Sequence, residues 1–403
     1  MAYTPDPTDV TNPLDTVDAS TAAAEFRALK GYLSTLVGGG GFPEVNVFRK
    51  NAIIGGDFDT NPWQRGVGNF VGVADGVYTA DRWKRNKIGT MVEDVIQFAD
   101  APVLGTVYKN RTADNFAVNC FQANVTTAEA VLGAGNTSIY SHIIEGYNFK
   151  LFAQVPLILS FWHKHTKAGT YCVACRNSGT DRSFVAEYTQ AVADTWEYDS
   201  IAVPASPAAG TWNYTTGIGL NISFVRGCGA TFQTAAGVWT VGNFIATANQ
   251  VNSLDTIGNK FRITLVQLEV GSIASKFERR SFQEELSLCQ RYFQKTYAQG
   301  ITPGTLTGTG GGESFGIIGK AGATGQAIFV KLPVVMRSTS SVITLFNPSR
   351  ANAQVDNESI NADHTASGAA GVRESSFIIN TTGNAGGAVG DIMGVHWTAD
   401  AEL

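Results

Sequence analysis

Short runs of alternating apolar and polar residues extend over about residues 46–278, and a period of two limits such runs to extended strands with one buried face. The clearest runs have apolar residues at every second position: Val155, Leu157, Leu159 and Phe161; Ile218, Leu220, Ile222 and Phe224; Phe261, Ile263 and Leu265. After Leu265 the phase shifts to Val266, Leu268 and Val270, which predicts a β-bulge. Because no amphipathic helices separate the runs, we expect a mainly β fold, an antiparallel jelly-roll β-sandwich.

A second periodicity predicts an N-terminal α-helical coiled coil. Apolar residues recur there at spacings of four and three: Ala22, Phe26, Leu29, Leu33 and Leu36. This spacing is typical of a coiled-coil seam. An isolated helix of this length is marginal in water, so we expect the seam to pack against copies of the same chain. The alternative is a helix lying on the chain's own β domain.

Shifts in composition divide the chain into five predicted segments. They are an extended attachment peptide (1–17), the coiled-coil helix with its glycine linker (18–41), the jelly-roll domain (42–280), a short helix (281–295) and a smaller C-terminal β domain (296–403). The short helix is indicated by Ser281 and Glu284, which have the spacing of a capping box.

The charge balance excludes some partners. Only 16% of the 403 residues are charged and the formal net charge is −5, whereas nucleic-acid binding needs clustered Lys and Arg. The N-terminus lacks the features of a signal peptide, and the most apolar run, residues 151–162, is shorter than the ~20 residues that span a bilayer. We therefore expect neither nucleic-acid binding nor membrane insertion, and a cytosol-like site of synthesis.

Five scattered cysteines do not form the pattern of a disulfide framework, so we expect reduced, buried thiols. His163 and His165 followed by Cys172 and Cys175 could suggest zinc. However, residues three apart on a strand point to opposite faces, so the two cysteines would not converge. We commit to no metal site and no cofactor, and a structural calcium ion held by Asp57 and Glu269 stays open beside the alternative that such carboxylates accept turn N–H bonds.

Catalytic motifs are also missing. Glycoside hydrolysis needs two carboxylates across a sugar site, and Asp57 with Asp59 is the pair spaced to share a strand face. Carboxylates at turns are common, however, and we expect these two to shape a turn. The prediction is a protein that is not an enzyme, with no catalytic residues.

Aromatic residues carry the binding hypothesis. Sugar rings present C–H faces that pack on Trp and Tyr, so exposed aromatics on a β-sandwich are candidate glycan platforms. We single out Trp162, Trp212 and Trp239. Trp162 follows the strand run at 157–161 on the opposite parity, which favours an outward side chain.

Several stretches together resemble bacteriophage tail fibres with carbohydrate-binding-like jelly rolls. They are residues 51–58 (NAIIGGDF), 63–66 (WQRG), 78–83 (YTADRW), 266–272 (VQLEVGS), 277–280 (FERR), 288–293 (LCQRYF) and 396–403 (HWTADAEL), with residues 18–27 similar to a virion-proximal helix. The resemblance implies a homotrimeric virion fibre that attaches to other virion proteins through its N-terminus and contacts host-surface glycans. The chain departs from the family at His163-Lys164-His165.

Two other functions remain open from the sequence. One is a structural connector or capsid decoration protein without a ligand. The other is a polysaccharide depolymerase tailspike.

Overall fold

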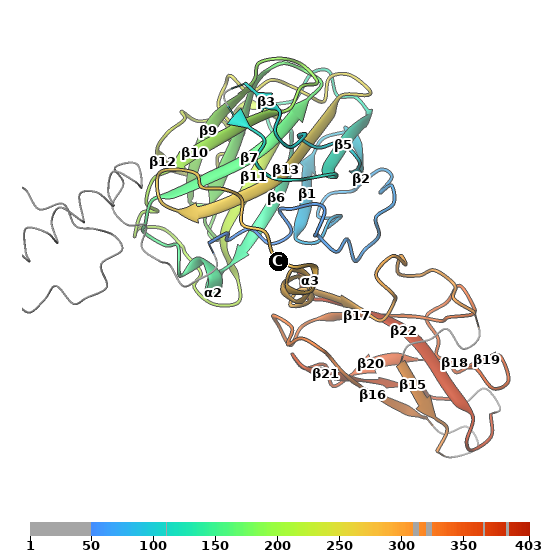
Figure 1. Ribbon diagram of the computed structural model, residues 1–403. Helices are drawn as coiled ribbons and strands as arrows, with labels where there is room; N and C mark the ends of the chain where they lie inside the picture. The colour runs from blue at the N-terminus through green and yellow to red at the C-terminus, as the bar shows by residue number, and fades with distance from the viewer. Residues whose placement is uncertain (1–49, 110, 309–313, 320–324, 366, 384–386) are drawn as a thin grey trace, which may run out of the picture. The chain divides into compact units, whose positions relative to one another are not determined.

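The computed structural model describes residues 50–403 apart from 110, 309–313, 320–324, 366 and 384–386. The described chain is mainly β, its strands pair antiparallel, and its arrangement is consistent with a jelly roll (Figure 1). The predicted attachment peptide and coiled-coil helix lie outside the described residues. So do all five seam residues, Ala22, Phe26, Leu29, Leu33 and Leu36.

Two sheets form the sandwich. Sheet I has the order β1 (Trp83–Ile88), β6 (Thr137–Glu145), β11 (Ile218–Cys228), β8 (Gly169–Arg176), β9 (Arg182–Gln190) and β12 (Trp239–Val241). Sheet II has the order β10 (Glu197–Val203), β7 (Leu157–His165), β13 (Lys260–Val270), β5 (Cys120–Thr127) and β2 (Val92–Phe98). The chain crosses repeatedly between the sheets, so each sheet is built from strands distant in sequence.

Aromatic side chains fill the space between the sheets. Phe121 of β5 meets Tyr140 of β6 edge to face, with ring centroids 4.9 Å apart. Phe161 of β7 meets Phe224 of β11 in the same way at 5.0 Å. Both pairs join one sheet to the other through residues that the alternating pattern assigns to the buried face.

The predicted bulge in β13 is confirmed. The pairing of β13 with β7 shifts register between Thr264 and Gln267, and Leu265 adopts a positive φ of 52°. The backbone therefore absorbs the extra residue where the apolar phase changes.

A buried charge cluster lies inside the sandwich. Arg226 donates through Nε to Glu93 Oε1 at 2.9 Å, and Arg85 Nη2 lies 3.2 Å from Glu93 Oε2. Ser138 donates its hydroxyl to the same carboxylate at 3.0 Å. All three charged side chains are fully buried.

Residues 229–250, here called the covering segment, cross the outer face of sheet I. They include the 3-10 turn η2 (Ala230–Phe232) and strand β12. The segment packs Ile245 and Ala246 onto outward-facing side chains of sheet I, among them Val185 and Val225. A second, smaller hydrophobic cluster results outside the sandwich core.

Two helices and a hairpin complete this part of the chain. The helix α2 (Gly146–Phe149) follows β6, and a hairpin of β3 (Val107–Tyr108) and β4 (Arg111–Thr112) follows β2. The helix α3 (Phe282–Gln290) begins after Ser281, whose side chain accepts a hydrogen bond from the Glu284 amide at 3.3 Å, as the capping motif predicts.

The C-terminal strands form two further sheets. One centres on β22 (Ile392–Asp400), with β14 (Phe293–Lys295), β15 (Ser314–Ile317), β17 (Val342–Phe346), β18 (Asp356–Asn357) and β19 (Ala362–Asp363). The other contains β16 (Ala327–Lys331), β21 (Ser376–Asn380) and β20 (Gly368–Ala370). Phe377 and Trp397 meet edge to face at 5.1 Å in their shared core.

Ion pairs connect the last residues of the chain to the sandwich. Arg82 pairs with Glu402, and Arg65 Nη2 lies 3.1 Å from Asp400 Oδ2. Arg82 is fully buried, so its charge depends on this contact for compensation.

All five cysteines are buried and unpaired, as expected. Burial raises the pKa of each thiol, to about 12 for Cys175 and Cys228. In the described part of the chain, no helix has the length and apolar character of a membrane span.

Candidate functional site

Two of the three predicted platform residues lie together. Trp212, between β10 and β11, and Trp239 of β12 have ring centroids 5.7 Å apart at an interplanar angle of 73°. Both side chains are half-buried at the margin of the main core. The structure thus joins residues that are 27 positions apart in the sequence into one aromatic surface.

Backbone and core contacts fix both indoles. Trp212 Nε1 donates to Ala209 O at 3.1 Å, and Trp239 Nε1 donates to Pro204 O at 2.9 Å. The Trp212 ring also stacks on the buried ring of Phe149 at 5.2 Å. Because their N–H groups are satisfied and one face is packed, the rings are held in place before any ligand arrives, which lowers the entropy cost of binding.

Polar groups border the aromatic pair. Thr211, which precedes Trp212, donates through its amide and its hydroxyl to the carboxylate of Asp181, at 3.1 Å and 2.9 Å. Hydrogen bonds from Asn177 and Thr211 lower the pKa of Asp181, so its side chain is a charged acceptor. We call Trp212, Trp239, Thr211 and Asp181 the aromatic site.

A glycine is required where the aromatic site begins. Gly210 has a φ of +109°, a conformation that L side chains rarely adopt. A β-carbon there would also lie 2.6 Å from Cγ of Arg182. The close approach of this loop to the start of β9 therefore depends on Gly210.

The third predicted platform residue, Trp162, is not exposed, so this expectation is corrected. Its side chain is only 2% exposed. As strand parity predicts, Trp162 points away from the main core that contains Phe161. However, Tyr108 of the β3–β4 hairpin and Tyr198 of β10 cover it, with ring centroids 5.5 Å and 5.3 Å away.

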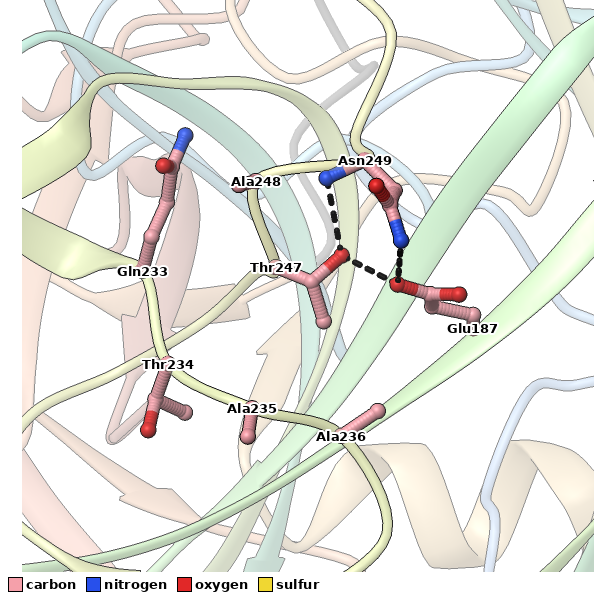
Figure 2. Close-up of a pocket in the computed structure, with 8 residues that line it drawn as sticks. All are labelled: Glu187, Gln233, Thr234, Ala235, Ala236, Thr247, Ala248 and Asn249. Atoms are coloured by element: carbon pink, nitrogen blue, oxygen red, sulfur yellow. Dashed lines mark hydrogen bonds between the residues drawn. The ribbon is translucent and has the colours of Figure 1, made fainter.

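A hollow of about 410 Å³ with a mixed polar and apolar lining lies at the covering segment (Figure 2). Its lining comes from β9 and from two parts of the covering segment: Glu187, Gln233, Thr234, Ala235, Ala236, Thr247, Ala248 and Asn249. Glu187 accepts hydrogen bonds from the Thr247 hydroxyl and, at 3.0 Å, from Asn249 Nδ2. Amides, hydroxyls and a carboxylate of this kind can bind hydroxyl groups. The sequence did not predict the hollow, because seven of its eight lining residues lie in the covering segment, which has no periodic pattern.

The histidine and cysteine residues considered for zinc do not converge. Cys175 packs in the main core, whereas Cys172 packs in the outer cluster under the covering segment, as strand parity predicts. His163 bonds instead to Asp199 at 2.8 Å and to Gln190 at 3.1 Å. Among the described residues, no group of three or more His, Cys, Asp or Glu side chains could hold a metal ion.

The carboxylates considered for hydrolysis have structural partners. Asp57 Oδ2 lies 3.3 Å from Arg279 Nη1. Asp59 accepts hydrogen bonds from the amides of Val118 and Asn119 at 2.9 Å and 2.8 Å, which fixes the turn before β5.

No protein-family model and no curated protein matches this chain. Its structural neighbours include carbohydrate-binding modules. TmCBM61 in complex with β-1,4-galactotriose is 11% identical, with a TM-score of 0.27, over 55% of this chain and 100% of that chain. The family 11 carbohydrate-binding module from Clostridium thermocellum, in complex with a β-1,3-1,4-mixed-linked tetrasaccharide, is 12% identical, with a TM-score of 0.26, over 52% and 99%.

A longer match is to the CBM22-1-CBM22-2 tandem domain from Paenibacillus barcinonensis Xyn10C. It is 11% identical, with a TM-score of 0.24, and covers 84% of this chain and 99% of that chain. Scores this low carry neither ligand nor function over to this chain. Nothing among these neighbours points to a bacteriophage fibre.

Proposed function

We propose that this chain is a non-catalytic glycan-binding protein that contacts sugar through the aromatic site. The observation that carries the proposal is the pair Trp212 and Trp239, two half-buried indoles 5.7 Å apart whose N–H groups are already bonded to backbone carbonyls. Rings held in this way offer apolar faces to the C–H side of a sugar. The neighbouring Asp181 and Thr211 supply polar atoms for its hydroxyl groups.

The non-catalytic part of the proposal is supported by the carboxylates. Asp57 faces Arg279, and Glu285 lies 3.3 Å from Arg280, so these acidic groups are occupied with arginines. Both carboxylates thus have structural partners in the fold.

The wider role we propose is that of a homotrimeric bacteriophage virion fibre, made in the host cytoplasm and adhering to host-surface glycans. It is supported by the quoted sequence resemblance and by the seam of residues 22–36. In a trimer each weak site occurs three times, so avidity strengthens adhesion without tight single contacts.

The test is binding of the full chain to a panel of immobilised glycans, with Trp212→Ala and Trp239→Ala compared against the unchanged protein. Phe116→Ala is the matched control, because Phe116 is an exposed aromatic outside the site. We expect the two tryptophan variants to lose binding and the control to keep it. Absence of binding to any glycan, or binding that survives both tryptophan substitutions, overturns the proposal.

A further inference from the structure

A second hollow, of about 260 Å³, lies on the outer face of sheet I on the side of β1. Its polar lining includes Arg176, Asn86, Thr137 and Asn243, and its apolar lining includes Ile139 and Phe232. Ile139 and Arg176 point outward because their neighbours Tyr140 and Cys175 pack in the main core. The volume is slightly below the ~300–1,000 Å³ of drug-sized ligand sites, which suits a single sugar residue.

Arg176 lacks the counter-charge that other buried arginines of the sandwich have. Buried guanidinium groups elsewhere in the sandwich, such as Arg82 and Arg226, have a carboxylate partner. Arg176 forms no ion pair with any described residue. It donates only to neutral oxygens, Asn243 Oδ1 at 2.9 Å and Ser223 Oγ at 3.2 Å.

The guanidinium group therefore has unused donors. It carries five N–H groups, of which these two contacts use two, and its buried Nε has no hydrogen-bond partner in the described part of the chain. Burial without a carboxylate lowers the pKa of Arg176 to about 10, although the nearby Cys228 opposes the change. The side chain is thus charged at neutral pH and lacks a counter-charge.

We propose that this hollow binds a sugar residue bearing a carboxylate, with Arg176 pairing with that carboxylate. The inference rests on the proposed glycan binding and adds an acidic sugar to it, at a place distinct from the aromatic site. Asn86, Thr137 and Asn243 are placed to bond the sugar hydroxyls, and the ring packs on the apolar lining.

The charges around the hollow favour a singly charged ligand. Arg176 and Lys87 are positive and Asp75 is negative, so the lining carries a net charge of +1 (two minus one). Lys87 already donates to Met91 O at 2.7 Å, and Asp75 accepts from the Lys87 amide at 2.8 Å. A carboxylate neutralises the remaining charge, whereas a doubly charged phosphate ester leaves an excess beside Asp75.

The test compares D-glucuronate with D-glucuronamide, which has the same shape without the charge, by ligand-observed NMR titration of the full chain. We expect glucuronate to bind at least about tenfold more tightly, the effect of one charge-assisted contact. The Arg176→Met variant should bind both probes equally and should keep the neutral-glycan binding of the aromatic site.

Two further variants keep the test decisive if Arg176→Met does not fold. Ile88→Glu places a negative charge on an exposed side chain of the lining, so it should weaken glucuronate binding and leave glucuronamide unchanged. Asp75→Asn removes the opposing charge and should strengthen glucuronate binding.

The outcomes separate this inference from the proposed function. Three results would overturn the carboxylate site and leave the aromatic site unaffected. They are equal binding of the two probes by the unchanged protein, tighter binding of glucose 6-phosphate than of glucuronate, and glucuronate binding that does not change in Ile88→Glu. If glucuronate binding depends on Arg176 but neutral-glycan binding does not change on substitution of Trp212 and Trp239, the carboxylate site is supported and the aromatic site is contradicted. No binding of any probe removes both.

Discussion

Arg226 reaches Glu93 across the interior of the sandwich, with its Nε 2.9 Å from Oε1 and both side chains shielded from solvent. The two residues lie 133 positions apart, on strands of different sheets. Burial by itself raises the pKa of Glu93, but the charges of Arg226 and Arg85 outweigh burial and hold that pKa below its usual range. The carboxylate is therefore ionised and links sheet II to sheet I.

Removing the charge of Glu93 should destabilise the sandwich severely. In Glu93→Gln, two buried arginines lose their counter-charge, and breaking a buried pair in this way costs about 3–5 kcal/mol. The free energy of unfolding, measured by chemical denaturation, should fall by that amount. Glu374→Gln, at an exposed carboxylate between β20 and β21, is the control and should change stability by no more than about 0.5 kcal/mol. Similar losses in both variants would contradict the assigned role of the charge cluster.

Acidification below pH 6.5 should weaken the fold through two histidines. Burial lowers the pKa of His142 well below its usual range, and the nearby charge of Arg82 lowers it further. Burial also lowers the pKa of His165 well below that range, with contributions from the charges of His163 and Arg226. The unfolded chain then binds protons that the folded chain does not. Stability is thus complete above the unfolded pKa near 6.5 and falls, per histidine, by roughly 1.4 kcal/mol for each pH unit below it.

Thermal unfolding between pH 7.5 and pH 5 measures this dependence, and His165→Phe is the variant that separates the two histidines. The imidazole of His165 stacks on Tyr171 at 3.7 Å and lies 5.1 Å from the ring of Phe261, so a phenyl ring suits its surroundings. The variant should show about half the loss over this range. An unchanged slope would assign the dependence to other groups.

Loss of either indole of the aromatic site should weaken glycan binding by at least about tenfold, or ~1.4 kcal/mol, as expected for a packed aromatic at the centre of a binding surface. The two substitutions should not be additive, because the rings contact each other. The measurement is the Kd for the best glycan of the panel in the single and double variants. Additive losses would indicate that each ring binds a separate ligand.

The seam at residues 22–36 makes a prediction about assembly. Phe26→Asp combined with Leu33→Asp places charges along the apolar edge of the predicted helix. Light scattering should then report monomers where the unchanged protein is a trimer. A mass that stays constant on substitution would remove the helix as the source of assembly.

Local sequence patterns predicted the strands well, because a period of two reports directly which face is buried. The shift after Leu265 even located the register change in β13. Exposure on the outer face was harder to predict, since Trp162 has the expected parity but lies beneath the β3–β4 hairpin and β10. No pattern around residue 162 indicates that a distant segment covers it.

The candidate sites were predicted only in part. Trp212 and Trp239 were recognisable as aromatics, but their proximity depends on the loop between β10 and β11, whose path has no periodic signal. Arg176 gave no signal at all. Arg176 is a candidate ligand-binding residue because no carboxylate of the described chain pairs with it. Only the folded structure shows which acidic side chains lie too far away to do so.

The buried cysteines have a practical consequence. Thiols with raised pKa values that solvent does not reach react slowly with maleimides and iodoacetamides, which attack thiolates. One cysteine introduced at an exposed position, such as Val131 at 84% exposure, would therefore be the dominant target for a fluorophore or spin label. Native residues need not be replaced first, so ligand binding at either hollow or at the aromatic site could be followed spectroscopically in an otherwise unaltered chain.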